Sequence, residues 1–326
     1  MTRTRPIALI AAVAGLLCAY IAYAATGLRT EARFTPAKGL VSDAALLGNG
    51  HVVLAYPDEG VLADYAPEGK LTRHVIREGG LGVPFKPTMV CAGAKDGLLV
   101  FDEEEHHVFR VDPDGNFSKG IDLAVPEGTS TPIAAARIGG LSLTDDGSMW
   151  AMLSDRMQFA HFDGRGKLLG SLDLDRLLPY NGTYVRGQVT SDGTVYVLDY
   201  SQGAVLYRPP AVGSGAVPAL SKGQRPEAAA TKPAPFRRVR LSEKDSAFDA
   251  APTVQDFAVL DDGTMLVATT DARRPLLLLS KTGKGRSARP VSLQLGGATR
   301  LSIRASRGKF IVWAGDASVV FVLSPQ

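Results

Sequence analysis

Five charged or amide side chains recur at one position of this sequence, where they could bind a ligand together. They stand seven or eight residues before four of the six turn glycines, which are Gly50, Gly97, Gly147, Gly193, Gly263 and Gly308. The five side chains are Asp43, Arg186, Gln255, Asp256 and Arg300. Carboxylate and amide oxygens are preferred ligands of a divalent cation such as calcium, whereas aspartates beside arginines form ion pairs. The position therefore predicts either a ligand or cation site or a set of ion pairs.

Other residues with catalytic or metal-binding chemistry do not form a recognisable set. The five histidines stand at unlike positions relative to the glycines, which argues against their meeting at one metal: His51, His74, His106, His107 and His161. The acidic run Asp102–His107 is expected to be a solvated loop. No nucleophile elbow, phosphate-binding loop or paired cysteine motif occurs. The sequence thus predicts no catalytic residue.

The glycines mark an internal repeat. Their spacings are 47, 50, 46, 70 and 45 residues. The long interval contains Pro209–Pro235, a proline-, alanine- and glycine-rich segment that is predicted to be a flexible insertion. Without these 27 residues the interval of 70 becomes 43, so the chain consists of six similar units.

Each unit has the pattern of four short strands. An apolar run precedes the turn glycine and a β-branched or aromatic run follows it, as in TSDGTVYVLD. Two more turns then delimit a third and a fourth strand. Asp-Gly and Asn-Gly between such runs are typical of hairpins, because these residues tolerate positive φ. Six units of four antiparallel strands predict an all-β, six-bladed β-propeller over residues 29–326.

The sixth unit ends after its third strand, at Gln326. A missing outer strand would leave an open edge. The segment Arg29–Pro36 precedes unit one and has no place in it. We therefore predict that it pairs as the outer strand of blade six and joins the two ends of the chain.

An aspartate also recurs five to eight residues after each turn glycine. These residues are Asp58, Asp102, Asp155, Asp199, Asp271 and Asp316. Because they recur in every unit, they are expected to cap the turns between second and third strands.

The chain resembles the NHL-repeat propellers and, more distantly, the gluconolactonase/senescence-marker family. The motifs that carry the resemblance are LSLTDDGSMWAMLSD, QVTSDGTVYVLDYS and QDFAVLDDGTMLVATTD. In that family an Asn-Asp pair at the corresponding place helps to hold a divalent metal; here the pairs read Gln255-Asp256 and Ser42-Asp43. The further ligands that the resemblance implies are missing, since other blades offer Val90, Gly140 and Leu301 there.

The N-terminus has the pattern of an export signal. Arg3 and Arg5 precede the uncharged stretch Ile7–Leu28, which is long enough to span a membrane. Ala22-Tyr23-Ala24 also offers a signal-peptide cleavage site. Residues 1–28 are therefore predicted to be a signal peptide or a membrane anchor. Either one places the propeller outside the membrane, in the periplasm or the extracellular space.

Charge and composition narrow the possible partners. The whole chain carries 36 basic and 33 acidic residues, which is no basic footprint for nucleic acid. We predict an exported or membrane-tethered binding module that takes a protein, peptide or glycan at the channel mouth. The alternative is a lactonase-like hydrolase or lyase using a divalent cation. An envelope structural subunit is a third possibility.

Overall fold

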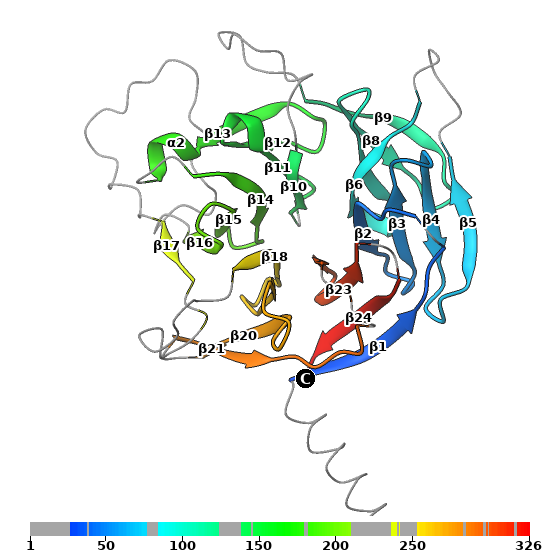
Figure 1. Ribbon diagram of the computed structural model, residues 1–326. Coiled ribbons are helices and arrows are strands. Elements are labelled where there is room, and N and C mark those ends of the chain that lie inside the picture. The colour runs from blue at the N-terminus through cyan, green and yellow to red at the C-terminus, as the bar shows by residue number, and fades with distance from the viewer. Residues whose placement is uncertain are drawn as a thin grey trace, which may run out of the picture.

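The protein is a ring of six blades (Figure 1). The computed structural model describes residues 27–326 except 38, 77–83, 124–137, 145, 179–181, 210–235, 240, 242–252, 283–284, 296–297, 299 and 316–317. Within these residues, each blade is a four-stranded antiparallel sheet. The predicted six-bladed all-β propeller is confirmed.

The innermost strand comes first in each blade, and the others follow outward in chain order, except that β1 closes blade six. Blade one contains β2 (Asp43–Leu46), β3 (Val52–Tyr56), β4 (Val61–Tyr65) and β5 (Leu71–Val75). Blade two contains β6 (Pro87–Ala92), β7 (Leu98–Asp102), β8 (His107–Val111) and β9 (Phe117–Asp122). Blade three contains β10 (Ile138–Leu143), β11 (Met149–Leu153), β12 (Gln158–Phe162) and β13 (Leu168–Asp173), followed by the short helix α2 (Leu174–Leu177).

Blade four contains β14 (Tyr184–Val189), β15 (Val195–Asp199), β16 (Ala204–Arg208) and β17 (Arg237–Arg238). Blade five contains β18 (Val254–Val259), β19 (Met265–Thr269), β20 (Leu276–Thr282) and β21 (Gly285–Pro290). Blade six contains β22 (Leu301–Ser306), β23 (Lys309–Ala314), β24 (Val320–Pro325) and β1 (Leu28–Phe34).

The second strands are continuous apolar runs because both of their faces are covered. In β3 every residue is buried. Val52 and Leu54 pack in the cluster shared with blade six, whereas Val53 and Ala55 pack in the cluster shared with blade two. Successive side chains of a strand point to opposite faces, so one strand serves two interfaces. The apolar clusters of the described residues all lie between neighbouring blades in this way.

Side-chain hydrogen bonds explain the recurring Asp-Gly turns. Asp192 Oδ1 accepts hydrogen bonds from the Thr190 hydroxyl at 2.7 Å and from the Thr194 amide at 2.9 Å. Gly193 then takes a φ of 80°, which favours glycine. Asp146 makes the equivalent bonds in blade three. The aspartate thus satisfies the backbone of the turn that joins the first two strands.

Three of the aspartates after the second strands cap turns, as predicted; one is Asp271, whose Oδ1 accepts from the Arg273 amide at 2.9 Å. Asp102 Oδ1 accepts hydrogen bonds from the amides of Lys86, Glu104 and Glu105. Asp199 Oδ1 accepts from the amides of Ser201 and Gln202. Both carboxyl groups are buried. Asp316 lies outside the described residues.

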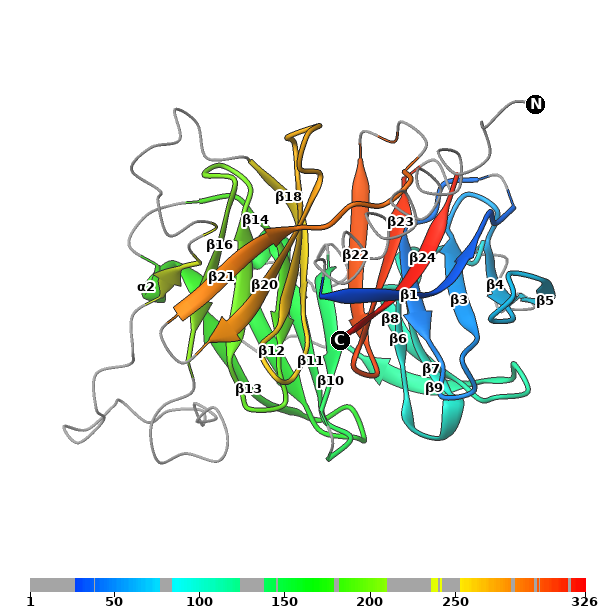
Figure 2. The same ribbon diagram turned by 90° about the horizontal axis from the view of Figure 1, so that it is seen from below.

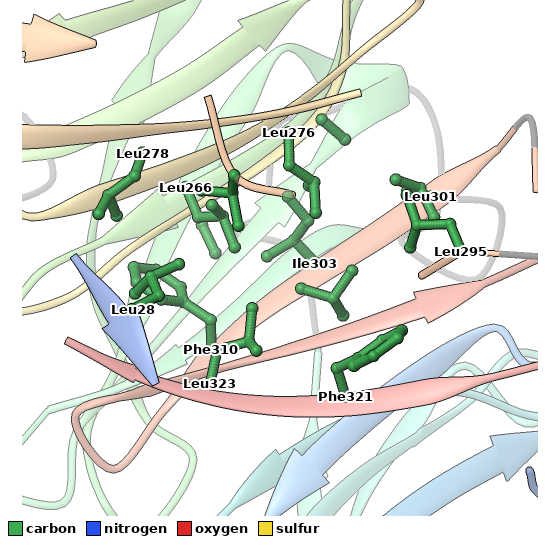
Figure 3. Close-up of a cluster of buried hydrophobic side chains, with 14 of the residues drawn as sticks. Leu28, Leu266, Leu276, Leu278, Leu295, Leu301, Ile303, Phe310, Phe321 and Leu323 are labelled. Carbon is green, nitrogen blue, oxygen red and sulfur yellow. The ribbon is translucent and has the colours of Figure 1, made fainter. Parts of the chain in front are cut away.

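The two ends of the chain close the ring in blade six. β1 pairs antiparallel with β24, from Leu28 opposite Pro325 to Phe34 opposite Val320 (Figure 2). Leu28 is buried in the cluster between blades five and six, near Leu266 and Phe310 (Figure 3). The predicted closure by the segment from residue 29 is confirmed.

Two predicted segments lie largely outside the described residues: 1–26 of the signal or anchor, and 210–235 of the insertion in blade four. Over the remainder that the structure describes, no helix has the length and apolar character needed to cross a membrane.

Candidate functional site

Four charged side chains meet where the innermost strands begin. Three of them were predicted: Asp43 of β2, Arg186 of β14 and Asp256 of β18. The fourth is Arg304 of β22. Arg186 holds Asp256 with Nε and Nη2, each 3.1 Å from a carboxylate oxygen. Arg304 Nε lies 2.5 Å from Asp43 Oδ1. The predicted set of ion pairs is therefore present.

Both carboxylates also hold backbone amides of the next blade. Asp256 Oδ2 accepts from the Ile303 amide at 2.9 Å, and its Oδ1 accepts from the Phe257 amide at 2.9 Å. Asp43 Oδ2 accepts from the Val90 amide at 3.0 Å, and its Oδ1 accepts from the Ala44 amide at 2.9 Å. Every oxygen of the two carboxylates thus has a nitrogen partner.

The four charges act on one another electrostatically. Burial by itself raises the pKa of Asp256, but Arg186 and Arg304 lower it further than burial raises it. Burial opposes the charge of Arg186, and Asp256 with Asp43 raises the pKa of Arg186 above its usual value. Burial and the like charge of Arg186 lower the pKa of Arg304, against the pull of Asp43 and Asp256. Opposite charges at these distances keep Asp256 ionised and Arg186 protonated.

A divalent cation does not fit among these four charged side chains. Calcium requires six to eight oxygen ligands, and the carboxylate oxygens of Asp43 and Asp256 are already occupied by N–H donors. Two arginines would also repel a cation. Among the described residues, no group of three histidine, cysteine or acidic side chains is arranged to hold a metal.

The other two predicted residues stand apart from the ion pairs. Gln255 is half-buried on β18, beside Asp256. Arg300 is exposed and precedes β22, where its carbonyl accepts the Gly315 amide. The structure therefore brings together Asp43, Arg186 and Asp256, and not Gln255 or Arg300.

Arg304 was missed because it lies two residues further along its strand than the position at which Asp43, Arg186 and Asp256 stand. Ser306 pairs directly with Lys309, so two residues form the turn. In blade five, Leu260 bonds to Thr264 across three residues. Counting back from the turn glycine is therefore off by one residue in blade six, and the equivalent position is Ser302, two residues before Arg304. Polar residues at alternate positions of this strand, Arg304 and Ser306, were the available signal.

Side-chain hydrogen bonds link five of the six neighbouring pairs of innermost strands. In each pair a side chain of one strand accepts a hydrogen bond from a backbone amide of the next strand around the axis. The pairs are Asp43 with Val90, Ser142 with Val189, Gln188 with Val259, Asp256 with Ile303, and Ser306 with Leu46. The two aspartates belong to this set, so their contacts hold neighbouring blades together.

A cavity of about 420 Å³ lies along the axis on the side of the turn glycines. Arg186 and Arg304 line its inner end, and Gly147, Asp261 and Gly308 line its outer end. All six innermost strands contribute to its walls. Asp43 and Asp256 are not part of the lining.

Comparisons with known proteins are consistent with this geometry. No family model matches the sequence, and no curated protein matches it significantly. Among solved structures, virginiamycin B lyase from Staphylococcus aureus superposes with a TM-score of 0.56 at 9% identity, covering 91% of this chain and 98% of the lyase. A gluconolactonase from Xanthomonas campestris gives a TM-score of 0.57 at 10% identity, with 92% and 89% covered. YCF48 bound to D1 peptide gives 0.51 at 10%, with 88% and 78% covered.

The likeness is one of fold. At these identities the neighbours, which include a lyase, a lactonase and a peptide-binding protein, carry no activity over to this chain.

A serine–histidine contact in blade three is also structural. His161 Nε2 lies 2.8 Å from Ser148 Oγ, which resembles a nucleophile with its base. However, Ser148 is buried and its hydroxyl contacts that of Thr144, while His161 stacks on Trp150. In blade one, His51 and Asp64 make the equivalent contact at 2.8 Å. A contact that recurs between blades supports the fold, and it lacks the access that catalysis requires.

Proposed function

We propose that this protein is a binding module of the cell envelope. It is exported, or held at a membrane by its N-terminal segment, and its propeller takes a protein, peptide or glycan on the face where the innermost strands begin. This face carries Gln255 and Arg300 at the starts of two strands and the exposed Tyr200 after β15.

The proposal rests on one observation: the charged groups of the channel already form ion pairs and hydrogen bonds that hold the blades together. Asp43 and Asp256 bind arginines and backbone amides, so neither is placed to act on a substrate or to hold a cation. The alternative, a lactonase-like hydrolase or lyase with a divalent cation, would need these carboxylates to leave the arginines. Non-catalytic recognition needs no such rearrangement.

Site-specific crosslinking in intact cells tests the proposal. A photoreactive amino acid replaces Tyr200 or Arg300 in the full-length protein. Leu169, which is 39% exposed on the outer strand β13, serves as the matched control. We expect one shared adduct from positions 200 and 300, recovered with the envelope fraction and absent at 169. No adduct at 200 and 300, or the same adduct at 169, would reject a specific ligand face.

Cell fractionation tests the location. The full-length chain is expected in the envelope or the medium, and a chain lacking residues 1–28 is expected in the cytoplasm. Equal distribution of the two chains would contradict export through this segment.

A further inference from the structure

The outer strands of blades four, five and six form a basic stretch of the rim. These strands are β17, β21 and β1, which follow one another around the ring (Figure 1). Their sequences contain six arginines and one glutamate: Arg29, Arg33, Arg237, Arg238, Arg286, Arg289 and Glu31. The outer strands of blades one to three contain two basic and two acidic residues: Arg73, Lys119, Asp122 and Asp173. One half of the rim therefore carries an excess of positive charge, and the other half is balanced.

Three of these arginines are exposed and unpaired. Arg237, Arg238 and Arg289 have no acidic partner among the residues that the structure describes. The single acid, Glu31, is neutralised by Lys309 and by Arg29, which lies 2.9 Å away. These two cations lower the pKa of Glu31 to about 2. The basic rim, defined as the strands β17, β21 and β1, thus presents guanidinium groups to its surroundings.

The chain enters the propeller on the basic rim. Gly27 accepts the Gln326 amide at 3.0 Å, and a Cβ atom on Gly27 would lie 3.2 Å from Leu278 of β20. Leu28 is buried in the cluster between blades five and six. Figure 2 looks onto this side of the molecule, with β1 and β21 in front. The N-terminal segment is therefore attached beside the exposed arginines.

No linker separates the predicted anchor from the propeller. Residues 7–26 are 20 uncharged residues, which is about the number that a helix needs to cross the hydrocarbon core of a bilayer. The next two residues, Gly27 and Leu28, already belong to the fold, since they bond to Gln326 and pair with Pro325. A chain anchored by this segment therefore holds the basic rim beside the lipid headgroups.

We propose that the basic rim docks on an anionic lipid surface. The docking rests on the membrane-tethered form of the proposed function. Guanidinium groups bind phosphate oxygens with charge-assisted hydrogen bonds. Each arginine near an anionic surface strengthens the attraction about fivefold. The channel axis then runs along the membrane plane, which leaves the ligand face accessible.

Hydrogen exchange of the full-length protein in lipid nanodiscs tests the docking. One set of nanodiscs contains phosphatidylcholine alone, and the other also contains phosphatidylglycerol. We expect the amides of β17 and β21 to exchange several-fold more slowly on the anionic nanodiscs, and those of β5, β9 and β13 to exchange at the same rate on both. Raising the salt to about 1 M, where the Debye length is about 3 Å, should abolish the difference. Equal exchange of β21 on the two lipids, or equal slowing of β13, would overturn the proposal.

A charge-matched pair of variants locates the contact. Combining Arg237→Gln, Arg238→Gln and Arg289→Gln removes three exposed charges from the basic rim and should remove most of the slowing. The control replaces three exposed cations on turns of blades one and three by glutamine: Lys70, Arg165 and Lys167. It should retain the slowing, and an equal loss there would show that net charge matters and not the rim. Unchanged exchange of the buried second strands confirms that both variants are folded.

Flotation with neutral phosphatidylcholine vesicles reports on the anchor separately. Flotation of the full-length chain, together with equal exchange of β21 on both lipids, would reject the docking and leave the membrane-tethered function standing. Failure to float would reject the tether and the docking together. Heparin is added to the neutral nanodiscs as a second polyanion. Slowing of β17 and β21 by heparin as strong as that by phosphatidylglycerol would overturn the assignment to lipid.

Discussion

Asp256 and Arg186 form a bidentate ion pair between blades five and four, and Asp256 also holds the Ile303 amide of blade six. One carboxylate thereby links three neighbouring blades. Asp256→Ala would leave Arg186 buried without its partner, which typically costs about 3–5 kcal/mol of unfolding free energy. Urea unfolding measures this loss.

The control for this variant is Asp271→Asn. Asp271 pairs with Arg274 at the surface and should contribute less than about 1 kcal/mol. Combining Asp256→Asn with Arg186→Gln should recover part of the loss, because neither member of this pair is then a charge without its partner. A loss for Asp256→Ala no larger than that of the control would show that the ion pair does not hold the ring.

Removing residues 29–37 should destabilise the whole propeller. This deletion takes most of β1 and exposes the edge of β24, so the ring loses its closure. Leu28→Ala probes the same strand more gently and should cost about 2–5 kcal/mol, as expected for a buried leucine. Thermal unfolding compares both variants with a chain lacking only residues 1–26. An unchanged melting temperature in the chain lacking 29–37 would refute the closure.

Gly140→Ala should destabilise the contact between blades three and four. A Cβ atom on Gly140 would collide with the carbonyl oxygen of Gly187 on β14. Overpacking of this kind costs about 1–3 kcal/mol. Gly147→Ala is the control without a steric collision, since nothing lies near its Cβ position. Its positive φ adds only backbone strain. Unfolding in urea measures both, and wild-type stability in Gly140→Ala would mean that the strands can separate at no cost.

His161 should make the stability depend on pH. Burial lowers its pKa more than Asp146 raises it, so the folded state holds the neutral imidazole. The unfolded chain takes up the proton near its ordinary pKa of about 6.5, so the free energy of unfolding falls as the pH drops below that value. Unfolding at pH 7.5 and pH 5.5 measures this loss. His161→Phe, which retains an aromatic ring on Trp150, should lose less stability over the same interval. An identical pH dependence in the variant would contradict this role of His161.

The sequence predicted the fold well because a turn glycine recurs at a similar position in each of the six repeats. Unit six lacks a fourth strand and the segment Arg29–Pro36 belongs to no unit, and these two features together predicted the β1–β24 pair. The site was predicted in part. Asp43, Arg186 and Asp256 follow the regular register, whereas Arg304 lies two residues beyond the equivalent position of its strand, Ser302.

Two further features of the site could not be predicted from sequence patterns. Gln255 stands beside Asp256 in sequence but outside the ion pairs, because it is the extra residue where the register shifts between Val254 and Asp256. The cavity could not be predicted, since it depends on how six strands pack around the axis.

The carboxylates of Asp43 and Asp256 hold the ring together and leave no place for a metal. The direct test is elemental analysis of the full-length protein after separate incubation with calcium, magnesium and zinc and removal of the free ions. We predict no stoichiometric ion and no rise in melting temperature with any of the three. One ion per chain that is lost in Asp256→Asn would contradict this role of the carboxylates and favour a metal-dependent enzyme.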